Sequence, residues 1–215
     1  MPKPKIVVLI SGSGTNLQAL INATASGVIN GTISQVISSS PGVMGLTRAE
    51  TASIPIYVHD LQGKYYAGVP KEDKASRKEA RQRFNVDLAA YILQDKPDLV
   101  VCAGWMLILA PSFLAPLERE KVPIINLHPA LPGAFAGTHA IERAWEAGQR
   151  GEITKAGVMI HKVITEVDEG EPLLIKELQL SKEETLDDYE ARLHAVEHIA
   201  IVEGTNIALK ELCGF

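Results

Sequence analysis

Two side chains suited to acyl-transfer chemistry stand two residues apart in the segment Asn126-Leu127-His128-Pro129. Residues i and i+2 of a strand point to the same face, so Asn126 and His128 project together if a strand ends here. An amide donor beside an imidazole can stabilise an oxyanion and move a proton. These residues alone leave a second interpretation open, in which the polar pair only caps the end of a strand.

A carboxylate that could complete this pair is Asp168, in the run EVDEG at residues 166–170. Close to His128, it would raise the pKa of the imidazole and could relay protons. An Asp shortly before a Gly is also an ordinary turn residue. Spacing along the chain does not show whether the two segments meet.

A glycine-rich loop, SGSGTN at residues 11–16, follows an apolar run near the N-terminus. In an open α/β sheet such a loop lies at the carboxyl end of a strand, where backbone N–H groups at the start of a helix bind phosphate. Thr15 and Asn16 could add side-chain donors. The alternative is a tight turn that binds no ligand.

Two better-known phosphate motifs do not fit this loop. The P-loop requires a Lys after its second glycine, where this chain has Asn16-Leu17. The dinucleotide-binding motif requires a small residue where Leu17 stands, and an acidic residue after the second strand, where SSSP follows at 38–41. The sequence therefore favours phosphate binding and disfavours NAD.

The run HAVEH at residues 194–198 matches an inverted zinc-peptidase motif. Two His four residues apart share a helix face, but a zinc site also needs a third ligand from elsewhere and an open coordination position. Accidental matches to so short a pattern are common. A polar helix face is the simpler interpretation, and we expect no metal.

The order of apolar runs and helical patterns predicts the fold that must position these residues. Short β-branched strands first alternate with helices, which predicts a parallel sheet with helices on both faces. The pattern then changes to two strands joined by a short turn at 166–171, as in an antiparallel hairpin or a tight crossover, and to a long final helix. The expected strands are 5–10, 32–38, 54–59, 99–103, 122–127, 156–164 and 172–180. The expected helices are 16–25, 43–51, 71–94, 111–117, 139–147 and 186–212.

The composition is typical of a chain that buries one core, with 215 residues of which 46% are hydrophobic. A net charge of −5 argues against a nucleic-acid binder, which normally carries a basic face. The apolar run at 6–10 is too short for a signal peptide or a bilayer span. Cys102 and Cys213 lack the spacing of a metal site or a disulfide framework, so a reducing compartment, the cytoplasm, is expected.

Six segments together resemble the phosphoribosylglycinamide formyltransferase family, and the resemblance covers essentially the whole chain. They are VVLISGSGTNLQAL, PDLVVCAGWMLIL, INLHPALPG, HAIERAWEAG, ITEVDEGEPL and AVEHIAIVE. The segments HPALPG and EHIAIVE resemble fungal single-function enzymes more closely than bacterial ones. The resemblance implies a formyltransferase fold: a single-domain, Rossmann-like α/β architecture with a mostly parallel twisted sheet, a C-terminal antiparallel strand element and a long final helix. It divides the domain into a phosphate-binding half at about 1–103 and a catalytic and folate half at about 104–215.

The resemblance also implies catalytic roles. Asn126 and His128 would stabilise the tetrahedral oxyanion, with His128 as the general acid. Asp168 would pair with His128 and assist proton transfer from the attacking amine. We call Asn126, His128 and Asp168 the catalytic trio.

Binding roles follow from the same resemblance. The substrate phosphate would lie on Gly14, Thr15 and Asn16, and the ribose on Glu197. A cation near the folate is expected at Arg81, with Lys74 and Arg77 as rivals. The residues expected to contact the folate are Arg81, Met106, Leu107, Ile108, Leu109, Asn126, Thr165 and Asp168.

Two departures from the bacterial relatives affect the folate contacts. The loop after His128 is shorter and lacks the His that precedes the Thr138-His139 pair. Leu107 stands where bacterial members carry an Arg. The catalytic trio itself is complete.

The activity implied is transfer of a formyl group from 10-formyltetrahydrofolate to the amine of glycinamide ribonucleotide, a step of one-carbon metabolism in purine biosynthesis. A sister formyltransferase acting on a charged tRNA or a sugar nucleotide would use the same trio. A formyltetrahydrofolate hydrolase usually carries an added regulatory domain, and a silent phosphate binder would not need the trio. We expect small-molecule partners without nucleic acid or membrane, and either a monomer or a weak homodimer.

Overall fold

The computed structural model describes residues 2–213, which fall into two compact units that meet in the sequence at Ile124 and Ile125. The single domain expected from the sequence remains a prediction.

A parallel sheet forms the centre of the first unit. Its strands are β1 (Lys5–Ile10), β2 (Thr32–Ser38), β3 (Ile56–Val58) and β4 (Leu99–Cys102), in the order β3-β2-β1-β4. All of their pairings are parallel. The last five residues of β1 are buried, as expected for a parallel strand covered on both faces.

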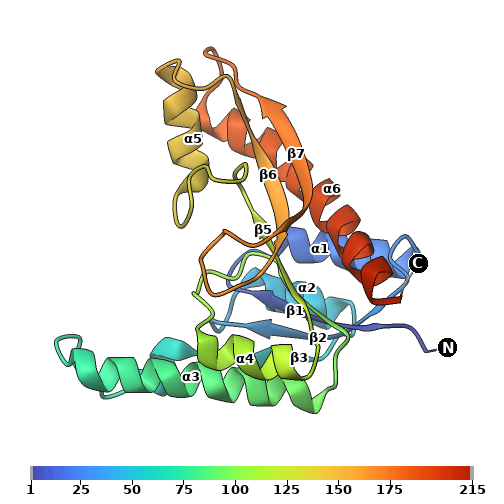
Figure 1. Cartoon of the computed structure of the whole chain (residues 1–215), viewed down its shortest axis with the longest axis vertical. Coiled ribbons are helices and arrows are strands. Elements are labelled where there is room, and N and C mark those ends of the chain that lie inside the picture. The colour runs from blue at the N-terminus through green and yellow to red at the C-terminus, as the bar shows by residue number, and fades with distance from the viewer. Residues whose placement is uncertain (1, 214–215) are drawn as a thin grey trace. The chain divides into compact units, whose positions relative to one another are not determined.

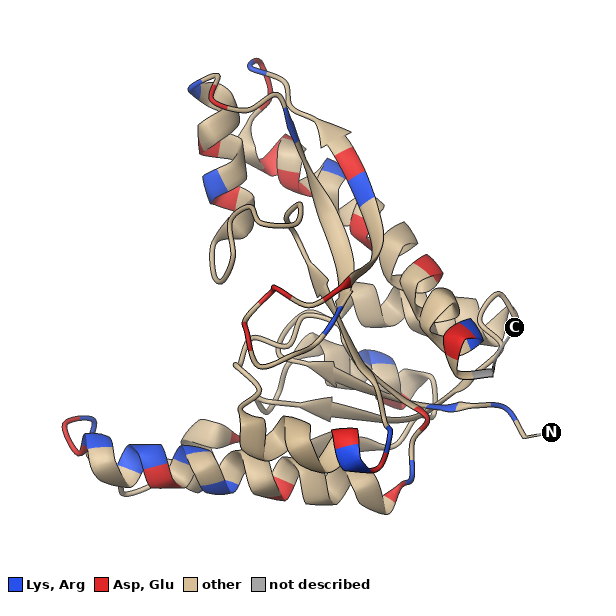
Figure 2. Cartoon of the chain, in the orientation of Figure 1, with Lys and Arg blue, Asp and Glu red and all other residues tan. Residues whose placement is uncertain are grey.

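The helices of this unit are α1 (Thr15–Ala25), α2 (Met44–Thr51), α3 (Lys74–Gln94), α4 (Pro111–Arg119) and a short π-helix, η1 (Leu61–Tyr65). Because crossovers between parallel strands are right-handed, the change of direction after β3 places α3 and α4 on the face opposite to α1 and α2. Figure 1 shows α3 and α4 side by side below the strands. Helix α3 begins at Lys74 because the Asp73 side chain caps it, accepting from the Ser76 N–H. Lys and Arg are concentrated in its N-terminal half (Figure 2).

The second unit contains an antiparallel strand element. Strands β5 (Ile124–His128), β6 (Lys155–Lys162) and β7 (Pro172–Gln179) pair in that order, and both pairings are antiparallel. The long helix α6 (Leu186–Cys213) packs on β6 and β7. The predicted α/β class, with parallel strands first and an antiparallel element and a long helix last, is confirmed.

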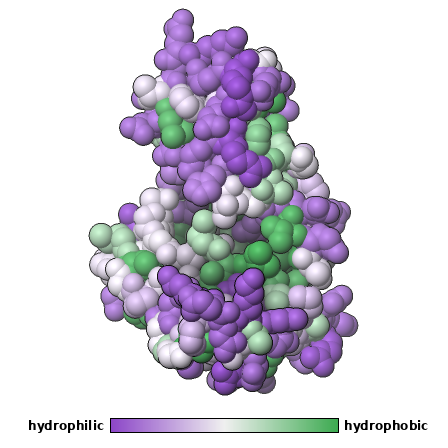
Figure 3. Space-filling view, turned by 90° about the vertical axis from the view of Figure 1, so that its left-hand side faces the viewer, coloured by the Kyte–Doolittle hydropathy of each residue, from purple (hydrophilic) through white to green (hydrophobic). Residues whose placement is uncertain are grey.

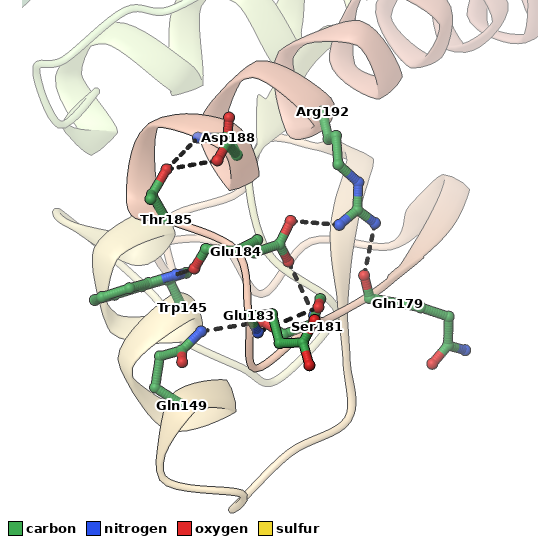
Figure 4. Close-up of polar contacts among 9 residues, drawn as sticks. All are labelled: Trp145, Gln149, Gln179, Ser181, Glu183, Glu184, Thr185, Asp188 and Arg192. Atoms are coloured by element: carbon green, nitrogen blue, oxygen red, sulfur yellow. Dashed lines mark hydrogen bonds and ion pairs between the residues drawn. The ribbon is translucent and has the colours of Figure 1, made fainter.

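A set of polar contacts joins helix α5 (Ala140–Gln149) to the connection between β7 and α6 (Figure 4). Trp145 Nε1 donates to the Glu184 carbonyl at 3.1 Å, and Gln149 Nε2 donates to the Ser181 carbonyl at 3.1 Å. Thr185 caps α6 by accepting from the Asp188 N–H at 3.2 Å. The bonds of Trp145 and Gln149 hold α5 at two points about one turn apart.

Large apolar side chains reach the surface in several places, Met106 (68% exposed) and Ile108 (64%) among them. The face drawn in Figure 3 is largely hydrophilic, with patches of hydrophobic side chains between. Within residues 2–213, no helix has both the length and the apolar character needed to cross a bilayer.

Candidate active site

The centre of the candidate site is the pair formed by His128 and Asp168. His128 ends β5 and is 4% exposed. Its Nδ1 lies 3.3 Å from Asp168 Oδ2, a distance that permits an ion pair or a hydrogen bond. Asp168 lies between β6 and β7 in the left-handed region, with φ 59°, a conformation that Asp tolerates better than most residues. The structure therefore brings together two residues that are forty positions apart in the sequence.

A third residue, His161, joins the pair. Its Nε2 lies 3.5 Å from Asp168 Oδ1 and 3.2 Å from Asn126 Nδ2. Its Nδ1 lies 2.9 Å from the Lys162 carbonyl, which fits an Nδ1–H donor. In the neutral ring Nε2 then accepts from the Asn126 amide, whereas only the protonated ring can donate from Nε2 to Asp168 Oδ1. His161 thus contacts both Asn126 and Asp168. Because Asp168 also contacts His128, all three members of the catalytic trio are linked.

Nothing in the sequence alone places His161 in the site. The signal that could have placed it in the site is the pairing of β5 with β6. In an antiparallel pair the residues directly opposite each other share a face, and His161 stands opposite Asn126. This register could not be read from the sequence, because β5 and β6 are joined through α5 and not by a short turn.

The electrostatics of the pair favour a neutral His128 beside an ionised Asp168. Burial lowers the pKa of His128, and the charge of Asp168 and the Phe135 carbonyl oppose this shift only in part. Burial alone would raise the pKa of Asp168, but the hydrogen bonds from His161 and from the Gly137 N–H, with the His128 charge, hold it below its usual value. With Nδ1 directed at Asp168, the other ring nitrogen, Nε2, can exchange a proton with a ligand. It is buried and has no hydrogen-bond partner within residues 2–213.

The glycine-rich loop lies in the first unit, at the carboxyl end of β1. Gly14 has φ 71° and is the N-cap of α1, and no side chain in residues 2–213 caps this helix. A Cβ on Gly14 would lie 2.6 Å from Gly45 Cα, so only glycine fits between the loop and α2. Arg48 Nε donates to the Ser13 carbonyl at 2.9 Å. The start of α1 therefore offers backbone N–H groups and a positive helix end with a cation nearby, which suits an anion.

The segment of residues 104–109 leaves β4 at the same edge of the parallel sheet as the glycine-rich loop leaves β1. Ser11 Oγ, in that loop, accepts from the Met106 N–H at 2.9 Å. Arg81 Nη2 donates to the Ile108 carbonyl at 2.7 Å. The segment thus offers exposed apolar side chains beside a guanidinium, an arrangement that suits a flat ring with a carboxylate tail.

The other sequence-predicted residues lie as follows. The Arg77 guanidinium is 3.8 Å from the centre of the Tyr66 ring, and Lys74 is exposed at the first position of α3. Thr165 is exposed between β6 and β7, and Glu197 is buried on α6 at 5% exposure. In the part of the chain that the structure describes, no group of three or more His, Cys, Asp and Glu side chains could hold a metal ion.

Comparison with known proteins identifies the family. The formyl transferase family matches residues 4–205. The chain is 54% identical over 213 residues to phosphoribosylglycinamide formyltransferase of Saccharomyces cerevisiae, covering 97% of this chain and 98% of that one. It is 46% identical to the enzyme of the same name from Schizosaccharomyces pombe, over 92% and 93% of the two chains. The crystal structure of glycinamide ribonucleotide transformylase 1 from Symbiobacterium toebii is similar with a TM-score of 0.82 and 31% identity, over 97% of this chain and 89% of that one. These findings confirm the resemblance and the enzyme class expected from the sequence, and the chain belongs to the formyl transferase family as one of its phosphoribosylglycinamide formyltransferases.

Proposed function

We propose that this chain transfers a formyl group from 10-formyltetrahydrofolate to the amine of N1-(5-phospho-D-ribosyl)glycinamide, in de novo purine biosynthesis in the cytoplasm. The observation that carries the proposal is the pair formed by the buried His128 and the half-buried Asp168 beside Asn126, in a chain of this family. The site residues and their roles below belong to the same proposal.

The chemistry begins with attack of the substrate amine on the formyl carbon. A C–N bond forms, the carbonyl oxygen becomes an oxyanion, and the attacking nitrogen becomes positively charged. The Asn126 amide donates to the oxyanion, and the His128 Nε2–H does so once the ring is protonated. His128 Nε2 takes up a proton from the attacking nitrogen, and Asp168 stabilises the imidazolium through Nδ1.

The adduct then collapses. His128 acts as the general acid and returns the proton to the nitrogen of the folate as the bond between that nitrogen and the formyl carbon breaks. One proton has moved from the amine to tetrahydrofolate, and the formyl group has moved in the opposite direction. Every step uses side chains of this chain, and none forms a covalent bond to the protein.

Binding is assigned to separate elements. The substrate phosphate lies on the backbone of Gly14, Thr15 and Asn16, because that helix start is open to an anion. Glu197 accepts from the ribose hydroxyls. The folate contacts that the resemblance implies are assigned to segment 106–109 in the first unit and to Asn126, Thr165 and Asp168 in the second, and the contact with the carboxylate tail is assigned to Arg81. Arg81 is preferred to Lys74 and Arg77 because it contacts this segment directly.

The decisive experiment follows the absorbance of a 10-formyl folate mixed with the enzyme, with and without glycinamide ribonucleotide. We expect deformylation only when the ribonucleotide is present. Deformylation without it would replace the proposal with a hydrolase. No deformylation with either mixture would favour a different acceptor or a silent binder.

A further inference from the structure

The loop between β5 and α5 holds an unusual backbone conformation beside the catalytic trio. Four of its residues have positive φ: Gly133 at 74°, Phe135 at 50°, Gly137 at 82° and His139 at 58°. For Phe135 and His139 this region is sterically unfavourable. Such a conformation persists only when surrounding contacts impose it.

Arg143, on the first turns of α5, supplies those contacts. Its Nη1 donates to the Ala136 carbonyl at 3.0 Å and to the Thr138 carbonyl at 3.1 Å. Its guanidinium carbon lies 5.4 Å from the centre of the Phe135 ring, within reach of a cation–π interaction. One guanidinium thus holds the peptide groups on both sides of Gly137.

The helix that carries Arg143 is itself fixed. Trp145 and Gln149, further along α5, donate to the carbonyls of Glu184 and Ser181 (Figure 4). Ala144, Ala147 and Gly148 are buried. Helix α5, which carries Arg143, is therefore held in place by contacts that do not involve the loop.

The loop that Arg143 holds touches both ionisable members of the catalytic trio. The Gly137 N–H donates to Asp168 Oδ2 at 3.0 Å, and the same oxygen lies 3.3 Å from His128 Nδ1. The Phe135 carbonyl, in the same loop, acts on the His128 ring as well, since it raises the pKa of that ring. A continuous chain of contacts therefore leads from Arg143 through Gly137 to Asp168 and His128.

We propose that Arg143 is a positioning residue of this active site, which holds the Gly137 N–H against Asp168 of the Asp168–His128 pair. It does so by binding the carbonyls on either side of Gly137. The expected effect on kcat rests on the proposed function, but the expected effect on the hydrogen bond between Gly137 and Asp168 does not.

The charge of Arg143 acts on the same pair. Among the charged and titratable groups that face His128, Arg143 and His161 lower its pKa and Asp168 raises it. Arg143 therefore favours the neutral imidazole that the reaction needs at its start.

The test compares Arg143→Gln and Arg143→Lys with the matched control Arg150→Gln. Arg150 lies at the other end of α5 and pairs with Glu146 and Glu152, so its removal takes the same charge from the same helix without touching the loop. We expect Arg143→Gln to lower kcat by about 10- to 100-fold, because small displacements of catalytic groups have effects of this size. The KM values should change little, since Arg143 contacts no substrate in the proposal. Arg143→Lys, which keeps the charge, should restore part of the rate.

A second measurement needs no turnover. In NMR spectra of the whole chain, the Gly137 amide should exchange its hydrogen faster in Arg143→Gln than in the wild type or in Arg150→Gln, because its bond to Asp168 is no longer held. If the wild type showed no formyl transfer but this difference appeared, the proposed function would fail and the role of Arg143 would stand.

Equal kcat and equal Gly137 exchange in Arg143→Gln and Arg150→Gln would overturn the proposal. Should Arg143→Gln fail to fold, Gly137→Ala tests the same contact. A Cβ there meets nothing within 4 Å, so the substitution disturbs only the positive φ. Its matched control is Gly133→Ala, in the same loop with φ 74° and equally open space. We expect a loss of kcat only in Gly137→Ala, and equal rates in the two variants would also overturn the proposal.

Discussion

His128 and Asp168 have different tasks in the proposed reaction, and each can be removed separately. His128→Ala deletes the ring that exchanges the proton and helps to hold the oxyanion. Loss of one such donor typically costs about 2.7–4 kcal/mol of barrier, on the order of 10²–10³ in kcat. Asp168→Asn keeps the shape but removes the charge that stabilises the imidazolium, and we expect a loss of similar order in steady-state assays.

Both variants should keep the fold, which circular dichroism and the thermal midpoint Tm would show. A matched control for Asp168→Asn is Asp187→Asn, which makes the same change at an exposed position in the first turn of α6. Turnover near the wild-type rate in His128→Ala or Asp168→Asn would exclude the mechanism.

The pKa of His128 provides a second test at the level of single residues. Burial lowers this pKa below 6.5, and the charge of Asp168 opposes the shift. Asp168→Asn removes that opposition, so the pKa of His128 should fall further. NMR titration of the ring resonances, assigned with a His128→Asn variant, measures it directly. A pKa that stays the same or rises in Asp168→Asn would contradict the pairing of the two side chains.

Most helices and strands could be predicted from the sequence, because each one is signalled locally. The strands at 5–10 and 32–38 have the bounds expected from the sequence. The helix expected from 71 begins at Lys74, since the Asp73 cap was not distinguished from the charged residues around it. The short helix η1 was not predicted, because its start depends on Asp60 accepting from two backbone N–H groups.

The contacts within the site could be predicted only in part. Asn126 and His128 are two residues apart on one strand, so their common face follows from the strand itself. The meeting of Asp168 with His128 and His161 depends on a left-handed residue in the β6–β7 connection and on strand register. Neither is a property of the local sequence. The resemblance to a family gave the trio, and it did not give His161 or Arg143.

The loop before α1 permits a prediction about one structural element. Gly14 and Gly27 both have positive φ, 71° and 79°, but an added Cβ meets Gly45 only at Gly14. Each Ala substitution should cost about 1–2 kcal/mol of backbone energy. Gly14→Ala must in addition displace the loop. We expect the KM for the ribonucleotide to rise at least about tenfold, equivalent to about 1.4 kcal/mol of binding, in Gly14→Ala and not in Gly27→Ala.

Steady-state kinetics with each substrate varied in turn would measure this effect. The KM for the folate should change less, since the phosphate is assigned to this loop and the folate is not. Equal KM values for the ribonucleotide in the two variants would mean that the loop at Gly14 does not bind the phosphate.

At the scale of the whole molecule, the buried side chains of His59 and His128 make stability depend on pH. His59 lies in the first unit at 1% exposure and His128 in the second at 4%. Burial lowers the pKa of each below 6.5. As the pH falls through 6.5 the unfolded chain binds protons before the native chain does, so the free energy of unfolding decreases until each native pKa is reached. The slope is at most about 1.4 kcal/mol per pH unit for each histidine. Asp168, whose pKa is held below 3.8, adds a loss only at more acidic pH.

These histidines can show whether the chain is one cooperative domain, as the sequence predicts. Calorimetry between pH 7.5 and 5 would follow Tm in the wild type, in His59→Gln and in His128→Gln, with His139→Asn as the control for loss of an exposed ring. If all 215 residues unfold in one transition, both Gln variants should flatten the dependence of that single Tm on pH, because both groups contribute to the same equilibrium. If the units unfold separately, two transitions should appear and each variant should change only one of them. The single-domain prediction would then be wrong, although each unit would keep the local geometry from which the site was derived.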